Sequence, residues 1–91
     1  MQEFFKSVRN GDLKTVKKII KEGVEINSKE NCGWTALIYA SRFGYLKIVK
    51  YLVENGAKVN LKDNDDWTAL AYASFFGRLD IVKYLKEHGA K

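Results

Sequence analysis

The sequence predicts an all-α protein in which three similar helix-turn-helix units stack into a solenoid. Lys29–Lys58 and Lys62–Lys91 are identical at 21 of 30 aligned positions, with an offset of 33 residues. Two glycine columns extend this offset into the N-terminal third of the chain: Gly11, Gly44 and Gly77, then Gly23, Gly56 and Gly89. A fixed period of this size indicates a stacked-repeat architecture. We therefore expect one domain over residues 1–91, with units of about 1–28, 29–61 and 62–91.

The first unit is expected to contain two short antiparallel helices. Residues 2–10 carry apolar side chains at helical spacing, namely Phe4, Phe5 and Val8. Gly11 follows, where a residue that adopts positive φ can end a helix. The apolar pattern resumes after Asp12, a suitable N-cap, with Leu13, Val16, Ile19 and Ile20. Gly23 stands just past the expected end of this second helix.

A polar, turn-rich segment, residues 24–33, is expected to form an extended connection that ends in a β-turn, in which Gly33 supplies a positive φ. Thr35 can then cap the next helix by accepting a backbone N–H hydrogen bond. The later units are expected to repeat the helix pair. The third unit has one change at its turn, because Asp66 replaces Gly33. Asp tolerates a positive φ less well than Gly, so we expect this turn to be strained or of a different type.

A short motif, Thr-Ala-Leu-x-Tyr-Ala, occurs at Thr35–Ala40 and again at Thr68–Ala73. It resembles the T-P-L-H-x-A motif of ankyrin repeats, whose period of 33 residues also matches. The longer ankyrin pattern G-x-L-x-I-V-x-x-L-x-x-x-G-A-x-x-N is present at 44–60 and, up to the end of the chain, at 77–90. The resemblance therefore covers nearly the whole chain. Two departures are visible, with Ala36 and Ala69 where the family usually has Pro, and Ile38 and Ala71 where it usually has His.

The resemblance implies helix pairs with an L-shaped cross-section, joined by β-hairpin-like loops that project to one side. It also implies a protein-binding function through the hairpin tips and the concave face formed by the first helix of each pair. In other members of the family, the His at this position often braces the adjoining loop with a hydrogen bond. The Pro stiffens the first helical turn. We expect the departures to reduce local rigidity and to leave the fold unchanged.

The sequence contains no constellation of residues that would support catalysis or bind a cofactor. It has one histidine, His88, and one cysteine, Cys32, so a zinc site of nitrogen and sulfur ligands cannot be assembled. It also lacks a Gly-rich phosphate loop. The acidic turn at residues 63–66 lacks the Gly and the closing Glu of a Ca²⁺ loop, so we expect it to be solvated. We predict a non-enzymatic protein with no catalytic residue, metal site or cofactor.

Charge and hydropathy narrow the class of partner. The net charge of +5 is spread over the three units, whereas nucleic-acid-binding proteins usually gather basic residues on one face. One basic cluster lies at helical spacing, and a solvated helix face is its favoured interpretation: Lys14, Lys17, Lys18 and Lys21. Apolar runs are too short to span a bilayer, so we expect no membrane segment. A single cysteine and no secretory signal predict a reducing, intracellular location.

The two ends of the predicted stack differ from its middle. Where the later units have Tyr, Ile and Tyr, the first unit has polar residues, namely Lys6, Thr15 and Lys18. At the other end Lys86 replaces the apolar Val53. Terminal repeats need a polar outer face, so we expect a complete three-unit stack with two caps, with a fragment of a longer array as the alternative. The missing proline and the high identity of two units also fit an engineered protein, so both origins stay open.

Positions that differ between units are candidates for partner recognition, because scaffold positions should repeat. Among the columns that differ between the second and third units, four are singled out: Cys32/Asp65, Ile38/Ala71, Arg42/Phe75 and Tyr45/Arg78. Large aromatics at columns usually exposed in ankyrin proteins add to these, and both aromatic and Arg side chains are enriched at interface hot spots. The expected partner-binding residues are Cys32, Trp34, Ile38, Arg42, Phe43, Asp65, Trp67, Phe75 and Phe76. Phe75 is the strongest candidate, whereas Trp34 and Trp67 have the alternative role of covering the groove between loop and helix.

We therefore expect a protein-binding module whose concave face docks an apolar or acidic surface of a partner protein. Two alternatives remain at the level of sequence. In one, the exposed aromatics pair two copies of the chain into a homodimer. In the other, the chain is a designed scaffold with no natural target. Nucleic-acid binding through the lysine cluster is the weakest hypothesis.

Overall fold

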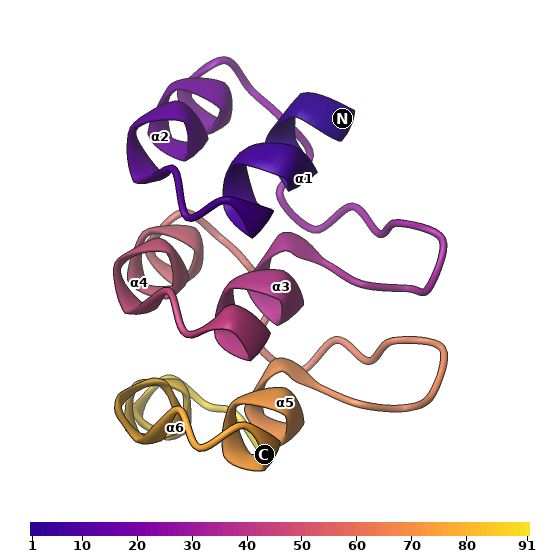
Figure 1. Cartoon of the computed structure of the whole chain (residues 1–91), viewed down its shortest axis with the longest axis vertical. Helices are drawn as coiled ribbons and strands as arrows, with labels where there is room; N and C mark the ends of the chain where they lie inside the picture. The colour runs from indigo at the N-terminus through magenta and orange to yellow at the C-terminus, as the bar shows by residue number, and fades with distance from the viewer.

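The computed structural model describes all 91 residues and contains six helices and no strands. The helices are α1 (Gln2–Arg9), α2 (Leu13–Lys21), α3 (Ala36–Phe43), α4 (Leu46–Glu54), α5 (Ala69–Phe75) and α6 (Leu79–Glu87). They form three pairs stacked along the longest axis, with α1, α3 and α5 in one column and α2, α4 and α6 in the other (Figure 1). Two loops project to the same side, beyond the α1–α3–α5 column. The expected all-α solenoid of three helix-turn-helix units is confirmed.

Side-chain caps begin three helices where the sequence predicts them. The Thr35 hydroxyl accepts a hydrogen bond from the Ile38 backbone N–H (3.1 Å), and Thr68 makes the same bond in the third unit (3.1 Å). The Asp12 carboxylate accepts one from the Thr15 backbone N–H (3.2 Å). Each bond satisfies a donor that the first helical turn leaves without a partner. Local sequence therefore sets the start of these helices.

Each projecting loop closes in a hairpin turn, hairpin loop 1 at residues 30–34 and hairpin loop 2 at residues 63–67. Gly33 has φ +80° and Asp66 has φ +65°, so the two turns share one backbone conformation. In both, the N–H of this residue donates to the carbonyl three positions earlier, that of Glu30 (2.8 Å) or Asp63 (3.0 Å). The turn type is therefore unchanged. The substitution is absorbed as strain at Asp66, because a left-handed conformation costs a residue with a side chain roughly 1–2 kcal/mol.

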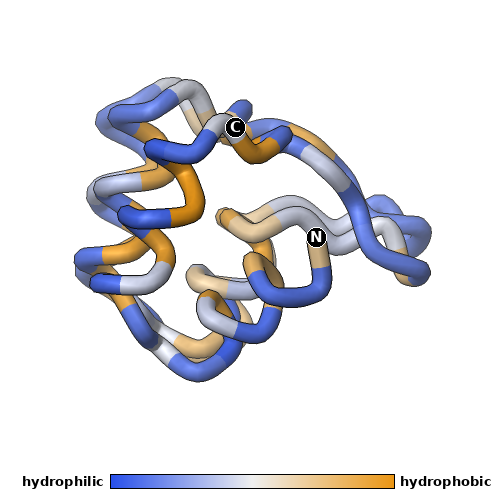
Figure 2. The backbone as a smooth tube through the Cα atoms, turned by 90° about the horizontal axis from the view of Figure 1, so that it is seen from above, coloured by the Kyte–Doolittle hydropathy of each residue, from blue (hydrophilic) through white to orange (hydrophobic).

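The core lies between the two helix columns and is built largely from residues that recur in each unit. Viewed along the stack, the apolar residues of the α2–α4–α6 column lie mainly on the side that faces α1, α3 and α5 (Figure 2). The side chains of Ile48, Leu52, Ile81 and Leu85 are buried. Ala40 and Ala73 are also fully buried. Their small size lets α3 and α5 pack closely.

Paired asparagines tie each interunit loop to the end of the following helix pair. The Asn27 side-chain amide donates to the Gly56 carbonyl (3.1 Å) and accepts from the Lys58 backbone N–H (2.9 Å). Asn60 makes the equivalent two bonds one unit further on, to Gly89 (3.0 Å) and Lys91 (2.9 Å). These bonds satisfy backbone groups that the helix ends leave free. The asparagine columns are therefore part of the scaffold.

The column of Tyr45 and Arg78 also belongs to the scaffold, although its residues differ between units. The Tyr45 hydroxyl donates to the carbonyl of Arg9 (3.0 Å), and the Arg78 Nε donates to the carbonyl of Arg42 (3.1 Å). Arg9 and Arg42 are themselves equivalent positions. Two different side chains thus make the same contact with the preceding unit. This corrects the expectation that the mismatch at 45/78 marks partner specificity.

The two ends of the stack differ in polarity. At the N-terminal end, a shallow groove between α1 and α2 is lined only by polar side chains: Glu3, Lys6, Ser7, Asn10, Asp12 and Thr15. At the C-terminal end the polar Lys86 and the apolar Leu79 are both exposed, Leu79 to 76%. A polar face is therefore present at the first unit, whereas the third unit keeps a large apolar side chain in solvent.

Candidate partner-binding surface

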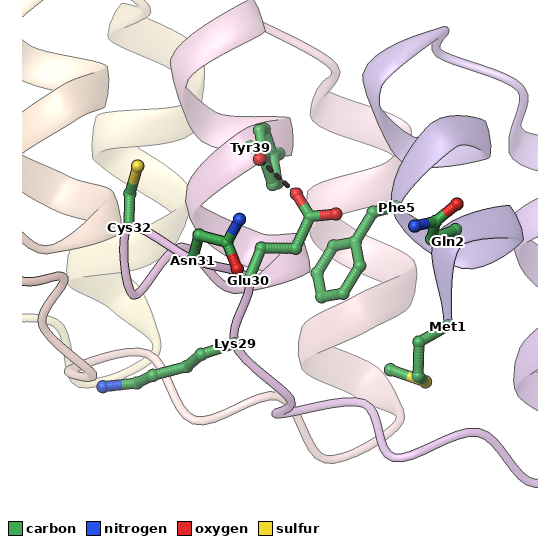
Figure 3. Close-up of a pocket in the computed structure, with 8 residues that line it drawn as sticks. All are labelled: Met1, Gln2, Phe5, Lys29, Glu30, Asn31, Cys32 and Tyr39. Carbon is green, nitrogen blue, oxygen red and sulfur yellow. Dashed lines mark hydrogen bonds between the residues drawn. The ribbon is translucent and has the colours of Figure 1, made fainter.

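Each hairpin loop is tied to the helix behind it by a tyrosine and a carboxylate. The Tyr39 hydroxyl donates to the Glu30 carboxylate, as the dashed line in Figure 3 shows, and the Tyr72 hydroxyl donates to Asp63. Burial, together with the hydrogen bond and charge of Glu30, raises the pKa of Tyr39. The loops are therefore braced by tyrosine although the histidine of the related motif is absent.

Asp63 is a buried structural carboxylate, which corrects the expectation of a solvated turn at this residue, whereas residues 64–66 are exposed as expected. It is 4% exposed, and its Oδ1 accepts from the backbone N–H groups of Asp65 and Trp67, each at 2.9 Å. Burial raises the pKa of Asp63, but the hydrogen bonds from Tyr72 and these N–H groups outweigh it, so the pKa lies below its usual value. Burial and then the hydrogen bond to Asp63 raise the pKa of Tyr72 to about 12.

A continuous row of aromatic rings runs from hairpin loop 1 to the end of α5. The Trp34 ring lies 5.3 Å from that of Tyr72, which lies 4.9 Å from that of Trp67, as measured between centroids. The row continues from Trp67 to Phe75 (5.6 Å) and from Phe75 to Phe76 (5.0 Å), both edge to face. Such geometries are favourable for aromatic pairs. The fold therefore brings aromatic residues of both hairpin loops and of the end of α5 into one continuous row.

Arg42 joins this row to the end of α3. Its guanidinium carbon lies 4.8 Å from the ring centroid of Trp34, 5.4 Å from that of Phe43 and 5.3 Å from that of Phe76. These distances allow cation–π attraction. No carboxylate neutralises Arg42, because the one salt bridge in the molecule joins Arg9 to Glu30. We call this set the aromatic–arginine surface: Trp34, Arg42, Phe43, Trp67, Phe75 and Phe76.

The members of this surface differ in how much of each side chain reaches solvent. Phe75 is 70% exposed and Phe76 is 41% exposed. Trp34, Arg42, Phe43 and Trp67 are half-buried. The two tryptophans therefore pack in the groove between loop and helix and still present part of their rings. Phe75 has the largest exposed fraction of the aromatic residues, so it is the member with the most apolar area available to a partner.

Cys32 and Asp65 lie at the exposed tips of the two hairpin loops. The tips are linked, since the Cys32 carbonyl accepts from the Asn64 backbone N–H (3.0 Å) and the Asn64 side chain donates to the Asn31 carbonyl (3.2 Å). Cys32 also lines an open hollow between α1 and hairpin loop 1 (Figure 3). Cys32 and Asp65 therefore lie at the loop tips, next to the aromatic–arginine surface, and are not members of it.

Ile38 is not part of any surface, which corrects its inclusion among the partner-binding residues. Its side chain is 1% exposed and belongs to the core. The equivalent residue of the first unit, Phe5, is likewise buried, whereas Ala71 in the third unit is half-buried. A buried side chain has no area to offer a partner. The side chain in this column becomes smaller from Phe5 to Ile38 to Ala71.

The tyrosine–carboxylate braces were missed in the sequence analysis, although the sequence contains a signal for them. An acidic residue precedes a tyrosine by nine positions in both later units, Glu30 before Tyr39 and Asp63 before Tyr72. Loop closure brings each pair into contact.

No three His, Cys, Asp or Glu side chains gather closely enough to hold a metal ion. The length and apolarity that a helix needs to cross a bilayer are met by none of the six.

Comparison with known families agrees with this architecture. Residues 4–91 match a family model described as ankyrin repeats, in three copies. The chain therefore belongs to the ankyrin repeat family. Members of this family generally act as protein–protein interaction modules and are generally non-enzymatic. A comparison with curated proteins finds no match.

Proposed function

We propose that the chain binds a partner protein through the aromatic–arginine surface, flanked by the hairpin tips at Cys32 and Asp65. The partner would present an apolar side chain to Phe75 and Phe76, and a carboxylate or a cluster of carbonyl groups to Arg42. Family membership supports the general role of protein binding. The particular surface is inferred from its exposure and composition.

The observation that carries this proposal is the environment of the Arg42 guanidinium. Its charge is held against three aromatic rings, with no carboxylate within ion-pair distance. A half-buried guanidinium forms charge-assisted, often bidentate hydrogen bonds when a carboxylate approaches. Aromatic residues around it exclude water from such a contact, and Trp, Tyr and Arg dominate the energetics of protein interfaces. The surface therefore suits a partner that combines apolar and acidic groups.

Partner capture from a cell lysate, compared across variants, tests the proposal. Trp67→Ala combined with Phe75→Ala should weaken capture by at least roughly tenfold, because it removes two adjacent rings of the surface. Tyr51→Ala is the matched control, since it truncates an aromatic residue of α4 in the other helix column. Circular dichroism of each variant confirms that the helices are retained. Equal capture by the intact chain and the double variant would reject this surface.

Arg42→Gln tests the chemistry of the partner. The variant keeps a polar side chain of similar length and removes the charge, so binding to an acidic partner should weaken by about tenfold. Added salt should weaken the intact chain more than the variant. If neither Arg42→Gln nor added salt weakens capture, the partner does not present an acidic group to Arg42, and only the apolar contact of the proposal would stand.

Pairing of two copies through the same aromatic residues is the competing use of this surface. Phe75 and Phe76 are exposed and adjacent, as a self-associating patch requires. Light scattering over a concentration series separates the two uses. A mass that stays at that of one chain supports binding of a foreign partner, whereas a mass that doubles and returns to one chain in the Phe75→Ala variant supports the homodimer.

A further inference from the structure

The helix column formed by α2, α4 and α6 carries its positive charge unevenly. Helices α2 and α4 are neighbours in this column (Figure 1). Together they contain six lysines and one acidic residue, Glu54, whereas α6 contains two lysines and two acidic residues. The six lysines are all exposed, and none forms a salt bridge, because the one salt bridge joins Arg9 to Glu30: Lys14, Lys17, Lys18, Lys21, Lys47 and Lys50. Unpaired positive charge is therefore concentrated on the first two helices of the column.

An apolar hollow of about 340 Å³ lies at the boundary between α2 and α4. Four apolar side chains line it together with Gly11 and Lys47, namely Leu13, Tyr45, Leu46 and Ile48. Ile48 is buried, but the other three apolar residues are half-buried, so part of each reaches solvent. The hollow therefore presents apolar area that the packing of the first two units leaves uncovered.

A second hollow adjoins the first, because Leu13 and Lys47 line both. The rest of its lining consists of Lys17, Lys50, Tyr51 and Glu54. The Lys17 Nζ lies 5.4 Å from the ring centroid of Tyr51, a distance that allows cation–π attraction. Three unpaired lysines thus border a continuous depression with an apolar lining. We call this set the lysine groove: Leu13, Lys17, Leu46, Lys47 and Lys50.

The boundary between α4 and α6 has the same scaffold but not this combination of side chains. Arg78 stands there at the position of Tyr45, and Asp80 stands at the position of Lys47. A guanidinium and a carboxylate therefore replace an aromatic ring and an ammonium group. Helix α6 forms with Asp80 in its first turn and has the same length as α4. The helix pair therefore does not require the lysine groove for its own structure.

We propose that the lysine groove binds an acidic segment of a partner protein, which places a large apolar side chain in the hollow and carboxylates beside the surrounding lysines. Charge complementarity selects an anionic partner. The apolar lining favours a protein segment over nucleic acid, because lysines bind nucleic acid through its phosphates and leave such a lining unused. The exposed carboxylate of Glu54, which lines the same depression, would also repel a phosphate chain.

The lysine groove is separate from the aromatic–arginine surface. The groove lies on α2 and α4, whereas the aromatic–arginine surface is built on α3, α5 and the two hairpin loops, in the other part of the molecule (Figure 1). Binding at one surface therefore does not depend on the other. A variant of either surface leaves the residues of the other unchanged, so the two proposals can fail independently.

Titration with two synthetic peptides, followed by nuclear magnetic resonance, tests the proposal. The leucine peptide has two leucines between two runs of three glutamates, and the glycine peptide has two glycines in their place. The leucine peptide should shift the backbone amide resonances of Leu13, Lys47 and Lys50 until they saturate. The glycine peptide should bind at least roughly tenfold more weakly, because it buries no apolar side chain in the hollow.

Lys47→Asp is the variant that removes the charge pattern with the least risk to the fold, since the third unit carries Asp at this position. It should weaken binding of the leucine peptide by at least roughly fivefold, and the loss should shrink with added salt. Lys86→Glu is the matched control, because it changes the net charge equally on α6, outside the groove. It should alter binding by less than about twofold.

Three results would overturn the proposal. One is that the leucine peptide shifts no groove resonance, or shifts only those of Trp34, Arg42 and Phe75, which would assign it to the aromatic–arginine surface. Another is equal binding of the two peptides, or equal losses in Lys47→Asp and Lys86→Glu, because attraction would then depend on net charge alone. The third is tighter binding of a single-stranded oligonucleotide or of anionic lipid vesicles than of the leucine peptide, because the partner would then be nucleic acid or a membrane.

Discussion

The second and third units are identical at 21 of 30 aligned positions, yet equivalent residues lie in different environments. Ile38 is 1% exposed in the second unit, whereas its counterpart Ala71 is half-buried, and the half-buried Leu46 corresponds to the exposed Leu79. The cause is the number of neighbours. The second unit is covered on both sides and the third on one side only. Some sequence differences between the units therefore reflect how many neighbouring units cover each position, and they need not reflect recognition of a partner.

The largest expected effect compares the two residues of that column directly. Ile38→Ala should lower the free energy of unfolding by about 3 kcal/mol, because truncation of a buried Ile leaves a cavity at the boundary between units. Ala71→Ile should change it by less than about 0.5 kcal/mol, because no unit covers this position. Urea denaturation measures both. Equal losses at 38 and 71 would show that position in the stack does not decide the role of this column.

The two hairpin braces should differ by a smaller amount. Tyr72→Phe should cost about 2 kcal/mol, because the buried Asp63 carboxylate loses a hydrogen-bond donor. Tyr39→Phe should cost about 1 kcal/mol, since Glu30 is more exposed and keeps its ion pair with Arg9 at 3.2 Å. Denaturation of the two variants in parallel measures the difference. A larger loss for Tyr39→Phe would reverse this ranking of the braces.

The brace of the third unit should also appear in the pH dependence of stability. The pKa of Tyr72 is raised to about 12 in the fold, so its contribution is complete below pH of about 10 and is lost as the pH rises through about 12. The pKa of Asp63 is lowered, so its contribution is present above pH of about 4 and is lost as the pH falls through the lowered value. Thermal unfolding across pH should show both limbs.

Tyr72→Phe is the control for the alkaline limb. It removes the titrating hydroxyl, so the loss of stability above pH of about 10 should become shallower than in the intact chain. An identical alkaline slope in the two proteins would mean that Tyr72 does not titrate with a raised pKa.

The smallest expected effect concerns the two hairpin turns. Asp66→Gly should raise the free energy of unfolding by about 0.5–1 kcal/mol, because Gly adopts φ +65° without strain. Gly33→Asp should lower it by about 1–2 kcal/mol. A Cβ at Gly33 would also come within 2.6 Å of the Asn64 side-chain oxygen and 2.8 Å of its backbone nitrogen. Denaturation of both exchanges measures this asymmetry. Opposite changes of equal size would show that the neighbouring hairpin has no influence.

Most of the scaffold could be predicted from sequence because it depends on short-range chemistry. The caps at Asp12, Thr35 and Thr68 bond to backbone groups three residues away, and the structure confirms them. The polar first unit was likewise visible as apolar columns that end at Lys6 and Thr15. Each of these predictions needs only residue type and spacing along one helix.

The candidate site was harder to predict because variation between units has two causes. Arg42 and the equivalent Phe75 differ on the aromatic–arginine surface. Tyr45 and Arg78 also differ, but they make the same contact with the preceding unit. The sequence alone does not separate these cases. Asp63 shows the same difficulty, because nothing in an acidic turn reveals that a tyrosine nine residues later will cover it.

The sequence by itself determined the period, the order of six helices, their caps and the family, because these follow from local propensity and from repetition. Only the tertiary structure decided which repeated columns lie between units and which face solvent. Burial depends on neighbours that are 33 residues away in sequence, and on whether such a neighbour exists. The tertiary structure places Ile38 in the core, brings three rings around Arg42, and leaves Leu79 exposed in the third unit.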